Sequence, residues 1–193
     1  MGFDLYGVKP QINEGTSEPK IPNGHDNLWH ESITEEERSV YFEETQVYEA
    51  ANPGVYFRNN VWHWRPLWGF ICHEVAPNIL TEKDKKSGHY NDGHLISAIK
   101  AIYIADAIDK LDKEGNLEKY QKDYDKSVSE LPNEECNVCT GDGFTIVDNK
   151  KKECHSCEGK GQKPNFANHY PFDTENIRHF SKFARESGGF KIL

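Results

Sequence analysis

The sequence predicts an α+β fold that is mainly helical: a small helical domain into which a β-hairpin with its own cysteines is inserted. Three patterns support this prediction. An apolar stripe recurs at helical spacing within residues 93–111, a second apolar helix face follows Phe172, and two cysteine pairs flank a β-type run. At 193 residues, 36% hydrophobic and 12% aromatic, the chain is long enough to bury a core. We expect a helical core with an N-terminal loop region over 1–132, the inserted module over 133–163, and a helix that returns to the core over 164–193.

The first fifty residues predict a strand, a loop and a helix. Gly2–Gly7 alternates apolar and polar side chains, which is typical of an edge strand. Residues 9–27 combine proline and glycine with polar residues and predict a loop. Thr34 stands three residues before a glutamate, which is capping-box spacing, and the helical pattern then continues to Asn52. The β-type run at 40–42 would also suit a strand.

Aromatic side chains concentrate between Gly54 and Cys72. Three of the four tryptophans lie there, together with two arginines and a histidine. Tryptophan and arginine are enriched at recognition hot spots, but large aromatics also fill cores. Two interpretations stay open: these aromatics form the core, or some of them line a pocket or contact surface. The candidate contact residues are Tyr56, Arg58, Asn60, Trp62, His63, Trp64 and Arg65. Pro66 predicts the start of a short helix that ends before Pro77.

A charged loop and the longest helix are predicted next. Residues 81–86 are charged and predict the loop, and an apolar stripe then predicts a helix over 93–111. His89 and His94 fall near the start of that helix, where unpaired amides and the helix dipole favour an anion. They are candidates to hold an anionic ligand or a second metal; the alternative is a pair of surface histidines. Residues 112–130 predict a solvated helix that leads to the cysteines.

Four of the five cysteines form two Cys-x-x-Cys pairs that are separated by fourteen residues: Cys136 with Cys139, and Cys154 with Cys157. A two-residue gap lets one tight turn aim both sulfurs of a pair at one metal, and four thiolates complete the tetrahedral shell of a zinc ion. The pattern therefore predicts one structural zinc ion, because a catalytic ion needs an open position. The alternatives are a disulfide pair or free thiols, but no signal peptide points to an oxidising compartment.

The residues around the cysteines predict a β-hairpin. The same glycine pattern follows both pairs, and glycine lets the chain turn back after a metal-holding knuckle. These glycines are Gly141, Gly143, Gly159 and Gly161. Residues 144–147 form a β-type run, 148–149 are a turn signal, and 150–153 return to the second pair. Together these features predict a zinc ribbon with a knuckle at each root of the hairpin.

The two Cys-x-x-Cys-x-Gly-x-Gly units resemble the repeats of the cysteine-rich domain of DnaJ-type (Hsp40) co-chaperones, over about 26 of the 193 residues. That family carries four repeats and a J domain with a His-Pro-Asp triplet. This chain has two repeats and no such triplet, so the resemblance implies the zinc site and not the co-chaperone activity.

The C-terminal segment predicts an amphipathic helix. Asp173 is an N-cap candidate, and Phe172 and Ile177 have the spacing of a hydrophobic staple. The pair Gly188-Gly189 ends the helix. A short helix with one strongly apolar face must dock, so we expect it to return to the core.

A second resemblance extends over most of the chain. The opening Met-Gly-Phe-Asp-Leu-Tyr-Gly, the run from Tyr56 to Trp68 and the ending Ser-Gly-Gly-Phe-x-Ile look like small uncharacterised proteins of tailed phages and prophages. This resemblance implies an origin and brings no assigned activity.

Composition argues against two classes of partner. A net charge of −9 opposes binding to phosphate backbones, so direct nucleic-acid binding is not expected. No run approaches eighteen apolar residues, so we expect a soluble cytoplasmic protein, in the host cytoplasm if the chain is phage-encoded.

Three functions follow from these patterns. The first is a non-enzymatic zinc-binding protein that acts by binding a partner protein, such as a host (defence) protein that it antagonises or modulates. The second is a protein that binds or sequesters a small nucleotide-like ligand on the aromatic and basic residues of 54–68 with His89 and His94. The third, a hydrolase of unknown substrate, has only the thiol of Cys72 beside His73 to support it, and a buried small hydrophobe is the alternative for that cysteine.

Overall fold

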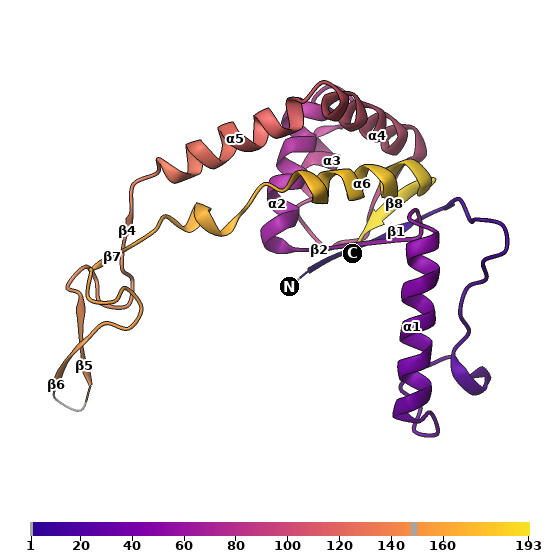
Figure 1. The fold of residues 1–193 in the computed structure, drawn as a ribbon, viewed down its shortest axis with the longest axis horizontal. Helices are drawn as coiled ribbons and strands as arrows, with labels where there is room; N and C mark the ends of the chain where they lie inside the picture. Colours follow the sequence, from indigo (N-terminus) through magenta and orange to yellow (C-terminus); the bar gives the residue numbers. More distant parts are fainter. Residues whose placement is uncertain (1, 148–149) are drawn as a thin grey trace.

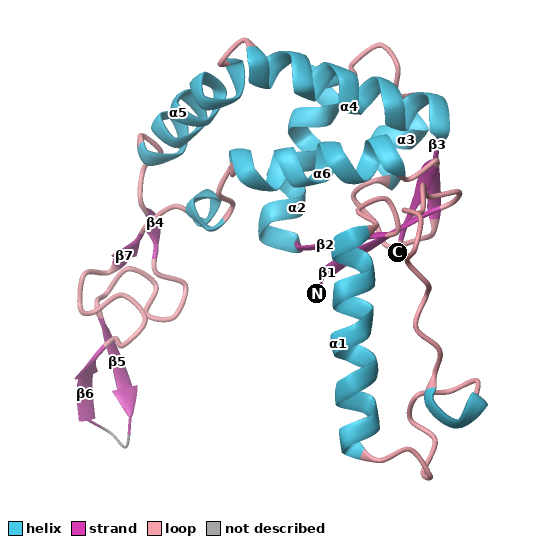
Figure 2. Cartoon of the chain, turned by 45° about the vertical axis from the view of Figure 1, so that its right-hand side comes forward, coloured by secondary structure: helices cyan, strands magenta, loops and turns pink. Residues whose placement is uncertain are grey.

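The computed structural model describes residues 2–147 and 150–193 (Figure 1). The strands are β1 (Gly2–Gly7), β2 (Tyr56–Asn60), β3 (His94–Ser97), β4 (Glu134–Glu135), β5 (Phe144–Val147), β6 (Lys150–Glu153), β7 (Gln162–Lys163) and β8 (Gly189–Ile192). The α-helices are α1 (Glu35–Ala51), α2 (Val61–Phe70), α3 (Glu82–Ser87), α4 (Ala98–Lys113), α5 (Asn116–Ser129) and α6 (Thr174–Glu186). Shorter helical turns are η1 (Pro22–Gly24), the π-helical η2 (Ile71–Val75) and η3 (Phe166–His169). Helices and short antiparallel strands together confirm the α+β class (Figure 2).

A four-stranded antiparallel sheet joins the two ends of the chain, with strand order β2-β1-β8-β3. β1 pairs with β2 from Gly2 to Tyr6 and with β8 at its far end, where Leu5 lies opposite Ile192. The strand at Gly2–Gly7 is therefore correct, but its placement at an edge is wrong: the C-terminal strand β8 lies beside it. Side chains along β1 alternate between the two faces of the sheet. Phe3 and Leu5 therefore face the core and are buried, while their neighbours in the strand are not.

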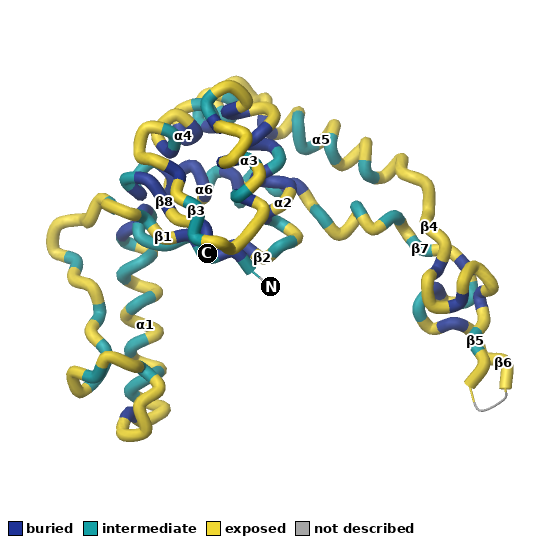
Figure 3. Tube along the Cα trace, turned by 180° about the vertical axis from the view of Figure 1, so that it is seen from behind, coloured by how far each residue is buried: buried dark blue, intermediate teal, exposed yellow. Residues whose placement is uncertain are grey.

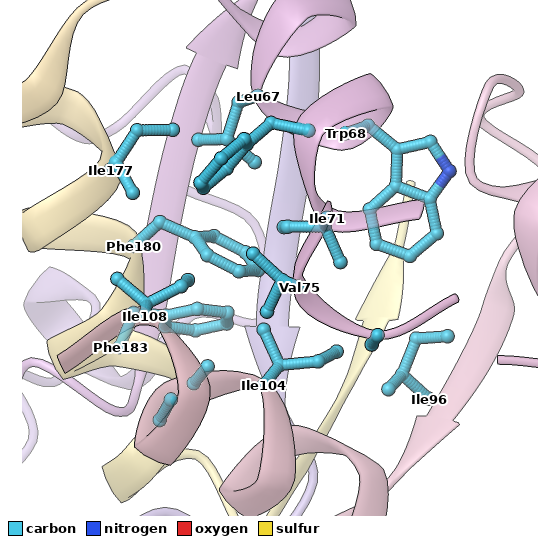
Figure 4. Close-up of a cluster of buried hydrophobic side chains, with 14 of the residues drawn as sticks. Leu67, Trp68, Ile71, Val75, Ile96, Ile104, Ile108, Ile177, Phe180 and Phe183 are labelled. Carbon is cyan, nitrogen blue, oxygen red and sulfur yellow. The ribbon is translucent and has the colours of Figure 1, made fainter. Parts of the chain in front are cut away.

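The main core lies between this sheet and the helices α2, α4 and α6. Figure 4 shows Leu67 and Ile71 facing Phe180 from opposite elements, with Ile104 of α4 close by. α6 makes its most extensive contacts with α4, so the C-terminal helix does return to the core as the sequence predicts. Buried segments concentrate in this body, while α1, α5 and the cysteine module are mostly exposed (Figure 3).

Three helix predictions need correction. α2 begins at Val61 with Asn60 as its N-cap, so Pro66 lies inside the helix and does not start it. Residues 81–86 are not a loop, because Thr81 and Asp84 form a capping box that starts α3. The long helix begins at Ala98, because residues 94–97 are drawn into the sheet as β3.

The other helix predictions are confirmed. α1 begins after the Thr34 capping box and ends before Asn52. None of its side chains is buried, and it projects from the body beside the N-terminal loop (Figure 2). α5 is largely solvated and leads to the cysteine module, and the Asp173 carboxylate caps α6 by accepting hydrogen bonds from two backbone amides.

The cysteine module lies away from the body, at the end of two chain segments formed by α5 and by the stretch around η3 (Figure 1). It contains two small antiparallel pairs: β4 with β7 where the chain enters and leaves, and β5 with β6 at the far end. The turn predicted at 148–149 lies outside the described residues. No helix among the described residues is long and apolar enough to cross a membrane.

Candidate metal centre

Four buried sulfurs meet between the two small sheets. The Sγ atoms of Cys136, Cys139, Cys154 and Cys157 all lie within 4.8 Å of one another. Cys136 Sγ is 3.9 Å from Cys154 Sγ, and Cys139 Sγ is 3.7 Å from Cys157 Sγ. A tetrahedral zinc ion with Zn–S bonds of about 2.3 Å places its sulfurs about 3.8 Å apart. The donor set and its spacing therefore fit a tetrahedral zinc ion, and four protein ligands leave no position for a substrate.

The backbone around the sulfurs follows a local two-fold pattern in which each residue has a counterpart eighteen positions later. The Cys136 amide donates to the Gly161 carbonyl over 2.9 Å, and the Cys154 amide donates to the Gly143 carbonyl over 2.8 Å. The Gly143 amide donates to Cys139 Sγ over 3.2 Å, and the Gly161 amide donates to Cys157 Sγ over 3.3 Å. Amides aimed at sulfur stabilise thiolates, which are the form that binds zinc.

Two of the four repeat glycines are required by close backbone contacts. Gly143 and Gly161 have φ of +76° and +71°, which L-residues adopt only with strain. A Cβ on Gly143 would lie 2.4 Å from the Gly159 carbonyl oxygen, and a Cβ on Gly161 would lie 2.2 Å from the Gly141 carbonyl oxygen. Each knuckle therefore packs directly on the backbone of the other, which brings the two cysteine pairs together.

The sulfurs do not ionise alike. Burial raises the pKa of Cys136, but the amides of Cys139 and Val138 outweigh it and lower that pKa to about 6. Burial, together with hydrogen bonds from the neighbouring sulfurs, raises the pKa of Cys139 to about 12. A divalent cation binds cysteine as thiolate, so metal binding at this cluster would release protons from the sulfurs. No other group of three or more cysteine, histidine or acidic side chains within 2–147 and 150–193 has this geometry.

The candidate contact residues of the aromatic stretch do not converge on one pocket. On the sheet, Tyr56 donates its hydroxyl to Asp4 and Arg58 pairs with the same carboxylate at 3.5 Å. Asn60 caps α2 by accepting from the His63 amide at 3.0 Å. The His63 ring also lies 3.1 Å from the same Asn60 oxygen, through its Nδ1. The side chains of Tyr56, Arg58, Asn60 and His63 therefore help to position β1, β2 and the start of α2.

The tryptophans of this stretch divide between core and surface. Trp64 is fully buried, stacks on Trp68 at 5.4 Å, and donates its indole N–H to the Gly88 carbonyl over 2.7 Å. Trp62 is 37% exposed and packs instead on Phe166 and Tyr170 of the segment around η3. The core interpretation holds for Trp64, which is not available for contact, while Trp62 fastens the root of the cysteine module to α2.

The two histidines near residue 90 have different surroundings. His94 lies in β3, and its Nε2 is 2.9 Å from Asp84 Oδ1. Lys100 Nζ reaches the other oxygen of Asp84 at 2.5 Å, so this buried carboxylate ties α3 to β3 and α4. Burial alone would raise the pKa of Asp84, but hydrogen bonds from Lys100, Thr81 and His94 hold that pKa far below its usual value. His94 is thus bonded to the buried carboxylate of Asp84 beside Lys100, whereas His89 is exposed near Arg65.

Cys72 lies in the core. It is 3% exposed, and burial raises the pKa of its thiol to about 12. Its neighbour His73 is exposed on the outer side of the π-helical turn η2. This placement fits the small-hydrophobe interpretation of the cysteine.

The sequence did not single out the tyrosines of α5 or Tyr170 as functional residues. Tyr120 and Tyr124 lie four residues apart and share a groove with Arg65 and His73. Their spacing of four residues predicts only that the two tyrosines lie on one face of a helix. The groove itself could not be predicted, because it depends on how α5 packs beside α2.

Comparisons with known proteins assign no relatives: no family model, curated protein or solved structure matches this chain. The resemblances to DnaJ-type repeats and to phage proteins therefore rest on the motifs alone.

Proposed function

We propose that this is a non-enzymatic zinc-binding protein that acts by binding a partner protein. The observation that carries the proposal is the cysteine module itself. A four-cysteine site completes the shell of a zinc ion, so the ion would hold the module together and take no part in a reaction.

The hairpin held by this site presents apolar side chains to solvent. Phe144 and Val147 are each 42% exposed and Ile146 is 79% exposed, although they lie on a four-residue strand. The hairpin contributes nothing to the main core, whose residues come from the body. An exposed apolar strand beside lysines suits a protein surface that covers it on association.

Charge favours a particular kind of partner. The whole chain carries a net charge of −9, although the hairpin strand β6 contributes three lysines. Complementary charge speeds association, so we favour a partner that meets the hairpin with an apolar surface and faces the rest of the acidic chain with a basic one. The resemblance to phage proteins adds the expectation that the partner is a host protein, such as a component of a defence system.

Capture of a partner by the zinc-loaded protein from lysates tests the proposal. We expect a discrete partner whose retention falls on replacement Ile146→Glu and on chelation of zinc. Ile99→Glu is a matched control, because Ile99 is 84% exposed on α4 of the body. If Ile146→Glu and Ile99→Glu captured equal amounts of the partner, or if zinc chelation left capture unchanged, a role for the hairpin would be contradicted. A turnover of substrate by the purified protein would contradict the non-enzymatic part.

A further inference from the structure

A groove lies where α2 and η2 pass the root of the cysteine module. It has a volume of about 420 Å³ and is bounded by α2, α5 and the segment around η3. Its size falls within the range of small-ligand pockets, about 300–1,000 Å³. The lining residues that matter for recognition are Arg65, Gly69, His73, Tyr120, Tyr124 and Tyr170.

One wall of the groove carries basic side chains. Arg65, Gly69 and His73 follow one another at intervals of four, which places them on one helix face, and His89 adds a third basic group nearby. Partial loss of solvent around the exposed His89 ring lowers its pKa, and the nearby charges of Arg65 and His73 lower it further. The electrostatic effect of Arg65 and His73 on His89 shows that the three basic side chains lie close together, and a bound anion would favour the charged form of the imidazoles.

These basic groups have no acidic partner in the described part of the chain. Arg178 pairs with three carboxylates and Arg185 with two, but Arg65, His73 and His89 form no ion pair or side-chain hydrogen bond there. The contrast is informative because acidic residues outnumber basic ones, 32 to 23. The acidic side chains whose charges reach the groove act on its tyrosines: Glu74 on Tyr120 and Asp125 on Tyr124.

The opposite wall is aromatic. Tyr120 and Tyr124 lie nearly parallel at 26°, with ring centroids 6.3 Å apart. Tyr120 also packs on Phe70, 4.6 Å between centroids, and Tyr124 donates its hydroxyl to the Tyr170 carbonyl over 2.7 Å. The rings are therefore fixed in place before any ligand arrives. Burial, and then the charge of Glu74, raise the pKa of Tyr120, so its hydroxyl stays protonated and able to donate.

Gly69 keeps the floor of the groove open. A Cβ at this position would meet no atom within 4 Å, so no close packing requires glycine here. Glycine inside a helix is less favourable than alanine by about 1 kcal/mol, and this one leaves free space between Arg65 and His73.

We propose that this groove binds a nucleoside phosphate, with the base against the tyrosine wall and the phosphate among Arg65, His73 and His89. Aromatic faces stack bases, and arginine pairs with phosphate oxygens through two parallel hydrogen bonds. Inorganic phosphate has no aromatic face to stack on the tyrosines, and an uncharged nucleoside has no anion for the basic residues. Only a nucleoside phosphate would contact both walls of the groove. This site is separate from the hairpin surface and does not depend on the partner-binding proposal.

Calorimetric titration of the zinc-loaded full chain tests the site, with AMP, GMP, CMP, UMP, adenosine and inorganic phosphate as probes. We expect saturable one-to-one binding of at least one nucleotide, and at least about tenfold weaker binding of adenosine and of phosphate. Arg65→Ala should weaken nucleotide binding about tenfold or more. Arg58→Ala removes the same charge from an exposed arginine on β2 and should leave binding unchanged.

A groove-filling variant separates this site from any other. Gly69→Leu places a side chain in the open space and should abolish nucleotide binding, while circular dichroism and zinc content stay as in the parent. Should that variant fold poorly, Tyr120→Ala serves as the second test and should weaken binding at least about tenfold. Failure of every nucleotide to bind at millimolar concentration would overturn the proposal. Binding that is the same in the parent, Arg65→Ala and the folded groove variant would also overturn it, as would phosphate binding as tightly as the nucleotides.

Discussion

The close contact between the two knuckles predicts that glycine substitutions in the repeats are unequal. Gly141 and Gly143 both have positive φ, +83° and +76°, so alanine at either position carries a strain of about 1–2 kcal/mol. A Cβ on Gly141 meets only the flexible side chain of Glu135, at 3.3 Å. A Cβ on Gly143 meets the Gly159 carbonyl oxygen at 2.4 Å, and overpacking of this kind adds about 1–3 kcal/mol.

Because metal binding and folding of such a module are linked, these energies are expected to reduce zinc affinity. Gly141→Ala should weaken zinc binding about tenfold, and Gly143→Ala should weaken it by a further factor of about 5 to 150. Competition against a chromogenic chelator measures both affinities, and far-UV circular dichroism reports whether the helical body is intact. The local two-fold pattern also requires Gly161→Ala to match Gly143→Ala, since its Cβ would lie 2.2 Å from the Gly141 carbonyl oxygen.

Equal affinities for Gly141→Ala and Gly143→Ala would refute the reasoning, because only the carbonyl contact distinguishes the two positions. A mild Gly161→Ala beside a severe Gly143→Ala would refute the two-fold pattern alone.

Three further predictions concern other parts of the chain. Cys136→Ser should abolish zinc binding, measured by elemental analysis, while the helical circular dichroism signal changes little, because the sulfur cluster and the main core share no residues. Asp84→Asn should lower the free energy of unfolding by about 3 kcal/mol in urea titrations, since Lys100 would lose its buried counter-ion and His94 its carboxylate partner. The lowered pKa of Asp84 means that its contribution is fully present above about pH 4 and is lost as the pH falls below that value, so the parent should destabilise on acidification more steeply than the variant. Phe180→Ala should cost about 3–5 kcal/mol by the same urea assay, because this side chain is fully buried between the sheet and the helices.

The metal centre could be predicted from sequence because its chemistry is local. Cys136 and Cys139 lie within one turn, as do Cys154 and Cys157. The Cys-x-x-Cys spacing of each pair is enough to predict that it binds a metal ion. α1 and α6 could be predicted for a related reason. Thr34 and Asp173 are N-cap residues, and an N-cap marks the start of a helix through contacts within a few residues.

The sheet could not be predicted because its pairings join distant segments. β8 lies beside β1, yet their residues are separated by nearly the whole chain. β3 has only four residues and continues directly into α4, so its apolar positions also fit the helical stripe. Likewise, nothing local separates Trp62 from Trp64: the side chains differ because α2 presents one to the core and the other to η3. The groove beside Arg65 depends on the packing of α5, and so it was also beyond local patterns.

The pairing of β4 with β7 has a practical consequence for the architecture. The chain leaves for the cysteine module at Glu134 and comes back at Lys163, and these two residues are direct partners across one short ladder. The two points where the chain enters and leaves the cysteine module are therefore adjacent. A two-residue β-turn could join Glu134 directly to Lys163 in place of the module, without distorting β4 or β7. We therefore expect that the cysteine module can be removed or replaced without unfolding the body. Circular dichroism would report on the helical body, and zinc content would report on the module.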